Sequence, residues 1–265
     1  MGEPATLTIS NRAPGVAQVT MARPEVFNAF DEAMIADLTR AFTQLGADPS
    51  VRVIVLAAAG KHFSAGADLQ WMQRASTASL QWNLEDARRF AAMLACIADC
   101  PKPTLARIQG AALGGGLGLA CACDIAIAAD NASFAASEAR FGILPAVIAP
   151  YLVNAVGLRQ ARHLALSATR ITAAQALSLG LVQQVVALEQ IDVAVDATLT
   201  ALLSGGPGAQ REIKQLYAQL EVGPVSAKVR ELTAQTISRV RGTAQAREGF
   251  AAFLEKRTAH WIPKA

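Results

Sequence analysis

The sequence predicts an α/β fold whose core alternates strands with helices and is followed by a purely helical segment. Two observations predict this order of strands and helices. Short β-rich runs alternate with stretches of helical spacing over the first two-thirds of the chain, and the pattern is helical from residue 157 onward. A third observation is the composition of the chain, with 52% hydrophobic and 17% charged residues. That balance provides a large apolar core and excludes a disordered chain.

The strands and helices can be placed in chain order. Residues 6–9 and 16–21 flank a turn and predict a hairpin. Residues 30–45 show helical spacing behind Asp31, a suitable N-cap, and the continuous β-rich run 51–58 predicts a buried strand. The later predictions are a helix at 80–98, strands at 104–108 and 124–129, and Ala-rich helices near 159–167, 172–179, 188–203, 208–220, 225–240 and 243–258.

The clearest linker is the glycine-rich stretch 205–208. We therefore expect a core at residues 1–200 that carries the site and a helical region at residues 201–265.

Charge and cysteine usage narrow the function classes. The net charge is +3 and no long run of like charges occurs, so nucleic-acid binding is not indicated. The longest apolar run, 111–123, is shorter than the roughly 20 residues that span a bilayer, and residues 1–20 do not resemble a signal peptide. Four cysteines without a familiar metal-binding spacing are expected to be reduced and buried. We therefore expect a cytoplasmic protein without a metal site or membrane association.

Two loops of small residues are the first candidates for chemistry. Residues 60–69 follow a buried strand and precede a predicted helix, and residues 110–118 are glycine-rich. Each alone is more typical of a tight turn, and neither has the spacing of a phosphate-binding loop. Together they could direct two backbone N–H groups at one oxygen, which is the oxyanion hole that a carbonyl needs as it becomes an enolate.

Glu138 is the third candidate because its neighbours in sequence are mostly apolar. Partial burial would raise the pKa of its carboxyl group toward the range useful for acid–base catalysis. The alternative is a surface glutamate paired with Arg140.

Together these segments resemble the enoyl-CoA hydratase/isomerase (crotonase) family over nearly the whole chain. The stretches that carry the resemblance are 23–29 (R-P-E-V-F-N-A), 63–69 (F-S-A-G-A-D-L), 110–124 (G-A-A-L-G-G-G-L-G-L-A-C-A-C-D), 171–182 and 249–257 (G-F-A-A-F-L-E-K-R). Each motif is weak alone, whereas the ordered set is specific.

The resemblance implies a spiral of ββα units with a C-terminal helical region that helps to form trimers, often stacked as hexamers. It implies coenzyme A thioester substrates and no prosthetic group. It assigns the oxyanion-hole N–H groups to Ala65 and Gly115, and Glu138 as catalytic. Contacts with CoA would come from the backbone around Ala67 and Leu69, from Phe253 and Lys256 of a neighbouring subunit, and from Arg23, for which a solvent-facing position is the alternative. Asp68 and Asp124 are expected to be structural.

One departure from the family pattern affects the mechanism. Gly118 stands where hydratases of the family commonly carry a second glutamate, so the chain is expected to work with Glu138 alone. The missing side chain would leave room either for a larger acyl chain or for an ordered water molecule. Residues 67–72 and 138–151 resemble the bacterial branch that hydrates methylglutaconyl-CoA and isohexenylglutaconyl-CoA, both branched and carrying a second carboxylate.

The acyl pocket is the least determined part of the prediction. Trp71 and Met72 could line it, although helical core packing explains them nearly as well. Arg74, Arg140 and His62 are candidates to bind a distal carboxylate, with a solvated or ion-paired side chain as the alternative for each.

The expected reaction is hydration of the enoyl double bond. An enoyl-CoA Δ-isomerase also suits a single glutamate. A decarboxylase, a thioester hydrolase and a non-catalytic CoA-binding protein are further alternatives.

Overall fold

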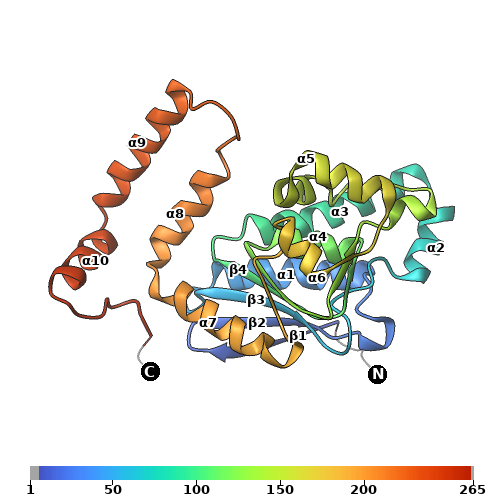
Figure 1. The fold of residues 1–265 in the computed structure, drawn as a ribbon, viewed down its shortest axis with the longest axis horizontal. Coiled ribbons are helices and arrows are strands. Elements are labelled where there is room, and N and C mark those ends of the chain that lie inside the picture. Colours follow the sequence, from blue (N-terminus) through green and yellow to red (C-terminus); the bar gives the residue numbers. More distant parts are fainter. Residues whose placement is uncertain (1–5, 264–265) are drawn as a thin grey trace.

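The computed structural model describes residues 6–263 and places a six-stranded sheet at the centre of the molecule (Figure 1). The strand order is β1-β2-β3-β4-β6-β9, antiparallel between β1 and β2 and parallel elsewhere. The strands are β1 (Leu7–Ala13), β2 (Val16–Met21), β3 (Val53–Ala58), β4 (Thr104–Ile108), β6 (Ile125–Ala129) and β9 (Gln184–Val186). The predicted hairpin, buried strand and later strands are confirmed.

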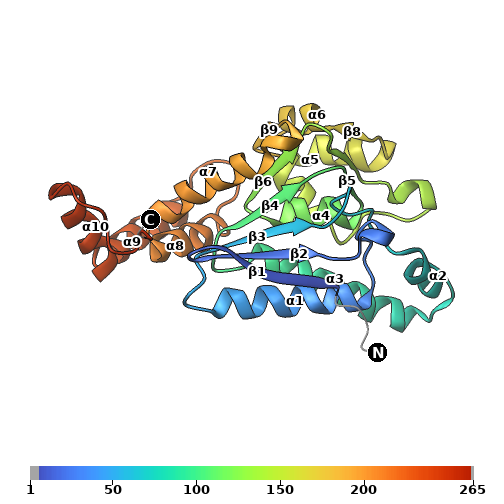
Figure 2. The same cartoon turned by 90° about the horizontal axis from the view of Figure 1, so that it is seen from below.

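Helices cover both faces of this sheet, which explains why β3 reads as a continuous apolar run. Its Ile54 and Leu56 belong to the larger core, and Val53 and Val55 belong to a second core on the other face. The larger core includes α1 (Glu32–Ala47), α3 (Leu80–Ala98) and α4 (Gly115–Ala122), whereas α7 (Ile191–Ser204) covers the opposite face (Figures 1 and 2).

A second, three-stranded sheet lies next to the first and carries the glycine-rich segment. Its order is β5-β7-β8, from β5 (Ala111–Leu113), β7 (Ser133–Ala135) and β8 (Ile171–Thr172). Strands of two or three residues carry too little alternation to be recognised from sequence, and β5, β7, β8 and β9 were not predicted. The remaining elements of the core are α2 (Leu69–Thr77), α5 (Ala149–Ser167), α6 (Ala173–Ser178) and the 3-10 turns η1 (Pro24–Val26), η2 (Glu138–Phe141) and η3 (Leu188–Gln190).

Helix ends follow local signals where those signals exist. The Asp31 side chain accepts a hydrogen bond from the Met34 N–H at 2.8 Å and caps α1, as predicted. The helix predicted at 80–98 matches α3 (Leu80–Ala98). Helix α5 consists of two helical segments that meet at a kink at Gly157, whose φ of 76° is not helical, and the helix predicted at 159–167 corresponds to the second segment.

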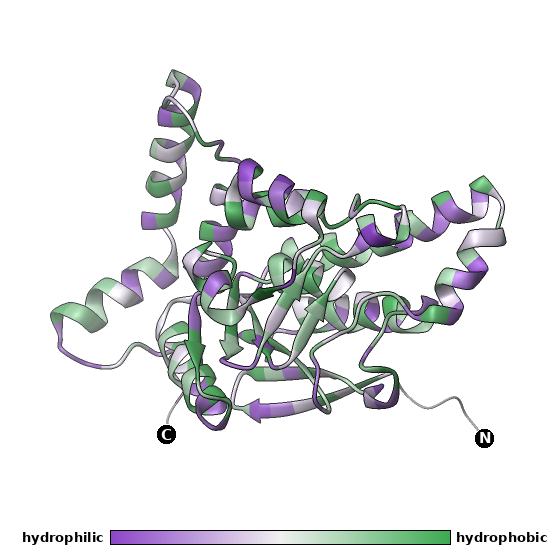
Figure 3. Cartoon of the chain, turned by 45° about the vertical axis from the view of Figure 1, so that its right-hand side comes forward, coloured by the Kyte–Doolittle hydropathy of each residue, from purple (hydrophilic) through white to green (hydrophobic). Residues whose placement is uncertain are grey.

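The last three helices project away from the sheets as an arm (Figure 1). They are α8 (Pro207–Tyr217), α9 (Ala227–Arg241) and α10 (Ala244–Leu254), and their exposed side chains include large apolar ones. Figure 3 shows apolar and polar residues interspersed along these helices. In the last turn of α8, the Lys214 ammonium donates to Asp124 at 2.6 Å, and Asp124 also accepts from the Thr104 N–H. The expected structural role of Asp124 is confirmed.

All four cysteines are free; Cys100 and Cys123 are buried, and Cys96 and Cys121 are half-buried. Within residues 6–263, no helix is both long and apolar enough to cross a membrane.

Candidate active site

The two candidate loops lie side by side, joined by backbone hydrogen bonds. The Ser64 N–H donates to the Ala111 carbonyl, and the Leu113 N–H donates to the Ser64 carbonyl, each at 2.9 Å. A Cβ atom on Gly116 would lie 2.8 Å from both the Cβ and the carbonyl oxygen of Ser64. Glycine is therefore required for the loops to approach at backbone distance.

The N–H group of Ala65 is not available to a ligand, so its assignment to the oxyanion hole is wrong. It donates to the Phe27 carbonyl at 3.0 Å. Ala67, two residues later, has the free donor. The Phe30 N–H donates to the Gly66 carbonyl, and the Phe30 carbonyl accepts from the Asp68 N–H. The N–H of Ala67, which lies between Gly66 and Asp68, therefore points away from Phe30. Ala67 is exposed, and its N–H has no acceptor within the described part of the chain.

The second donor comes from the start of α4. Gly114 has φ 50° and ψ −117°, and its N–H donates to the Ala135 carbonyl at 2.8 Å. The first intrahelical bond of α4 runs from the Gly118 N–H to the Gly114 carbonyl, so the Gly115 N–H is left free. The positive end of the helix dipole lies at the same place and favours a negatively charged oxygen. Gly66 and Gly114 are in contact, since a Cβ placed on Gly66 would lie 3.7 Å from the Gly114 Cα. Ala67 and Gly115, whose N–H groups are free, each come directly after one of these two glycines in the chain.

Glu138 lies against this pair of donors. Its Oε1 is 3.1 Å from the position that a Cβ would take on Gly114. Its Oε2 is buried and accepts no hydrogen bond in the described structure. Burial raises the pKa of Glu138 above its ordinary value. The alternative pairing with Arg140 is absent from the ion pairs of residues 6–263. A desolvated carboxylate without a partner beside a helix N-terminus is typical of a catalytic group.

The space beside Gly118 is occupied by Ile148, so it holds neither a longer acyl chain nor a water molecule as the sequence suggested. A Cβ on Gly118 would lie 2.4 Å from Ile148 Cγ2, 3.0 Å from Ile148 Cβ and 3.6 Å from Leu94 Cδ1. Ile148 is 2% exposed and stands directly before α5. A second carboxylate has no room at Gly118, and Glu138 is the carboxylate that lies against Gly114 at the start of α4.

Helix α2 places the predicted acyl-pocket residues immediately after the first loop. The Asp68 carboxylate caps it by accepting from the Gln70 N–H at 2.9 Å, which confirms the expected structural role of Asp68. Trp71 is buried, Met72 is half-buried, and Leu69 is exposed.

Two of the predicted cationic side chains are already engaged. Arg23 donates to Asp31 at 2.8 Å and to Asp68 at 3.2 Å, so it binds neighbouring loops rather than facing solvent. Arg74 pairs with Glu32 at 2.6 Å.

His62 and Arg140 are placed differently. The Nδ1 atom of His62 accepts from the Ala111 N–H at 3.1 Å. His62 lines a cavity of about 520 Å³ together with Lys61 and Arg107, which does not include Glu138. Arg140 is exposed two residues after Glu138 and has no ion-pair partner among residues 6–263.

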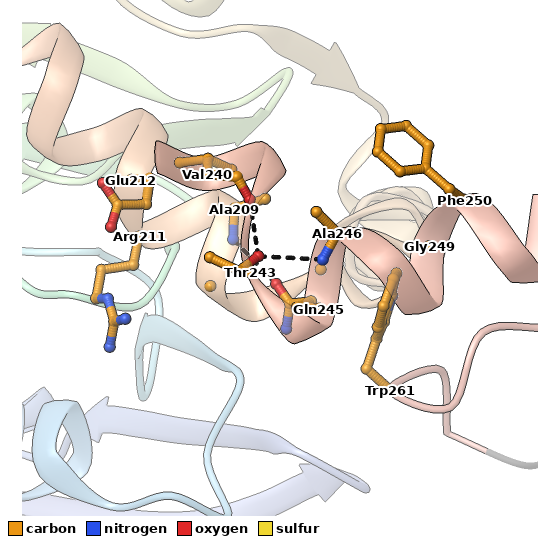
Figure 4. A pocket seen from close by; sticks show the side chains of 12 residues that line it. Ala209, Arg211, Glu212, Val240, Thr243, Gln245, Ala246, Gly249, Phe250 and Trp261 are labelled. Carbon is orange, nitrogen blue, oxygen red and sulfur yellow. Dashed lines mark hydrogen bonds between the residues drawn. The ribbon is translucent and has the colours of Figure 1, made fainter. Parts of the chain in front are cut away.

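Helix α10, which carries Phe253 and ends two residues before Lys256, lies at the opposite end of the molecule from α2 (Figure 2). Phe253 and Lys256 are both exposed, and α10 is remote from α2 and α4, which adjoin the two candidate loops. The arm also has its own cavity of about 540 Å³, lined in part by Phe250 and Trp261 (Figure 4). No predicted catalytic residue lines that cavity.

Comparison with known proteins identifies the family of the chain. The sequence model of the family described as enoyl-CoA hydratase/isomerase matches residues 11–264. The chain belongs to this family. Its α/β architecture, predicted from sequence as a crotonase fold, is shared by an enoyl-CoA hydratase from Shewanella pealeana, with TM-score 0.93, 38% identity and coverage of 97% of this chain and 96% of the other.

Two relatives are named for specific substrates. A crotonyl-CoA hydratase from Syntrophomonas wolfei is 32% identical over 94% of this chain and 95% of its own length. The mevalonyl-coenzyme A hydratase sidH of Aspergillus fumigatus is 30% identical over 96% of this chain and 94% of its own length. The chain is therefore an enzyme of the hydro-lyase class, acting on acyl-CoA thioesters.

Proposed function

We propose that this hydratase adds water across the C2=C3 bond of an enoyl-CoA by using Glu138 as its one carboxylate and the N–H groups of Ala67 and Gly115 as its oxyanion hole. The observation that carries the proposal is the buried Oε2 of Glu138, which has no partner in the described residues and lies beside Gly114 at the start of α4. An ionised carboxylate in such a place is ready to accept a proton.

The two proton transfers balance on a single residue. Glu138 removes a proton from water as the water oxygen bonds to C3, and the π electrons move onto the thioester oxygen. Glu138 is then protonated and returns its proton to C2 as the carbonyl re-forms. The raised pKa of Glu138 brings the carboxyl group closer to the pH at which it can both accept and donate.

The oxyanion hole accelerates the addition because its bonds strengthen as charge develops on the thioester oxygen. Loss of one such donor lowers kcat by about 10²–10³-fold in enzymes of known mechanism. Both donors here are backbone groups, so their removal requires moving the loop rather than changing a side chain.

For the acyl group we propose a branched chain with a second carboxylate, of the glutaconyl type. The resemblance of residues 67–72 and 138–151 to hydratases of such substrates supports this choice. The relative named for mevalonyl-CoA supports the branching alone, since mevalonyl is a branched acyl group without a second carboxylate. Arg140, which is exposed and two residues after Glu138, would bind the distal carboxylate.

The core at 1–200 would hold the catalytic site, and the region 201–265 would provide the assembly surface. Phe253 and Lys256 would then reach the CoA bound by a neighbouring subunit of a trimer or hexamer, since a Lys ammonium suits the CoA 3′-phosphate. The Ala67 and Leu69 backbones would contact its adenine. No prosthetic group is needed for these steps. The free cysteines suit a reducing cytoplasm.

Glu138→Gln tests the proposal because it keeps the side-chain shape and removes the base. We expect purified parent protein to convert a panel of enoyl-CoA thioesters, including crotonyl-CoA and a glutaconyl-type thioester, to products heavier by one water. Glu138→Gln should lower the rate by about 10²–10⁴-fold. Glu189→Gln, an exposed glutamate on η3, is the matched control and should keep the parent rate. A product of unchanged mass would indicate isomerisation and would overturn hydration.

A further inference from the structure

Trp71 has a buried polar atom that the proposed mechanism does not use. The residue is 9% exposed, and its indole Nε1 has no hydrogen-bond acceptor anywhere in residues 6–263. Buried tryptophan N–H groups normally have a partner, so an unpaired one calls for an explanation. An indole N–H only donates, and its missing partner must therefore be an acceptor atom.

Trp71 lies one aromatic ring away from the start of α4. Its ring packs edge-on against Phe90, with centroids 6.3 Å apart. The Phe90 Cζ in turn lies 3.0 Å from the position that a Cβ would take on Gly115. A single aromatic ring therefore separates the indole from the residue whose N–H contributes to the oxyanion hole.

Two unpaired buried atoms thus flank the start of α4. Glu138 lies against Gly114, and Trp71 reaches the adjacent Gly115 through Phe90. The other unpaired buried side-chain atoms of the described chain belong to Arg52 and Gln210. Those two residues hydrogen-bond to the segment at the base of the arm, outside this cluster.

We propose that the Trp71 indole N–H donates a hydrogen bond to an oxygen on the acyl chain of the bound thioester, and so selects acyl groups that carry a carboxylate or hydroxyl. A purely hydrocarbon chain would leave the buried N–H unsatisfied, and sites built around such a donor discriminate against ligands that lack the acceptor. This inference rests on the proposed function only in taking an acyl-CoA as the ligand, and it deepens that function by naming a residue that determines specificity.

Binding of saturated thioesters tests the inference without any turnover. Glutaryl-CoA and valeryl-CoA have acyl chains of the same number of carbons, and only glutaryl has the distal carboxylate. Their Kd values would be measured by calorimetry on the parent and on Trp71→Phe, which keeps an aromatic ring and removes the N–H. We expect the substitution to raise the Kd of glutaryl-CoA by about 10-fold or more relative to the Kd of valeryl-CoA.

Trp82→Phe, a half-buried tryptophan on α3, is the control and should leave the ratio unchanged. Trp71→Phe also removes ring volume from the core, so its thermal midpoint should fall. The ratio of the two Kd values carries the test, because a general loss of packing weakens both ligands alike. An unchanged ratio in Trp71→Phe, or equal weakening of both ligands, would overturn the inference. Trp71-dependent selection of glutaryl-CoA by a protein that hydrates no enoyl-CoA would instead support it and refute the proposed reaction.

Discussion

The contact between Gly118 and Ile148 makes a quantitative prediction about stability. In Gly118→Ala the new Cβ would lie 2.4 Å from Ile148 Cγ2 and 3.0 Å from Ile148 Cβ, well inside the ~3.5–4.0 Å of an optimal carbon contact. Because Ile148 Cβ is fixed to the backbone, a rotamer change cannot relieve both contacts. Overpacking of this kind costs about 1–3 kcal/mol, and the better helix propensity of alanine returns about 0.5–1 kcal/mol.

The double variant separates this contact from a general effect of each substitution. Ile148→Ala alone leaves a cavity and should cost about 2–5 kcal/mol. In Gly118→Ala with Ile148→Ala the new methyl group enters that cavity, so the loss of stability should be smaller than the sum of the two single losses by about 1–3 kcal/mol. Denaturant unfolding followed by circular dichroism, at one protein concentration because subunit assembly shifts apparent stability, measures all three. Strict additivity, or a Gly118→Ala protein as stable as the parent, would refute the assignment of Ile148 to this space.

Three further predictions concern pH. Because burial raises the pKa of Glu138, the hydration rate should rise with pH through that elevated pKa, measured as kcat/KM against pH. The native state then holds this proton more tightly than the unfolded state does, so the parent loses stability as pH rises. The melting temperature of Glu138→Gln relative to that of the parent should therefore increase from acid to neutral pH. No increase would contradict the burial of the carboxylate. For Asp192, hydrogen bonds from Arg107 and then Arg12 lower the pKa to about 2. The ionised Asp192 stabilises the fold above the ordinary Asp pKa, and this stabilisation disappears as pH falls through about 2. Asp192→Asn should therefore lower the melting temperature at neutral pH and leave it nearly unchanged at the acid end. An equal loss at both pH values would contradict this ion-pair network.

Features set by neighbouring residues could be predicted from the sequence. The caps at Asp31 and Asp68 and the helix at 80–98 depend on contacts within a few residues, and the structure shows them as expected. The candidate catalytic Glu138 could also be predicted, because its apolar neighbours indicated burial.

Features set by distant contacts could not be predicted. Whether Ala65 or Ala67 has the free N–H depends on which carbonyl each faces, and Phe27 and Phe30 decide this from an earlier part of the chain. Gly118 suggested open space because the sequence does not show that Ile148, thirty residues later, fills it. The unpaired indole of Trp71 could not be predicted either, since it depends on the absence of any acceptor around a buried side chain.

Hydration in heavy water tests most directly the claim that addition of water across C2=C3 requires Glu138. The parent protein should give a product heavier by one heavy-water molecule, with one of the two deuterium atoms on C2. Glu138→Gln should lose hydration and C2 labelling together, because the same carboxylate serves both steps. A Glu138→Gln protein that still forms the C2-labelled hydrated product at the parent rate would contradict the account.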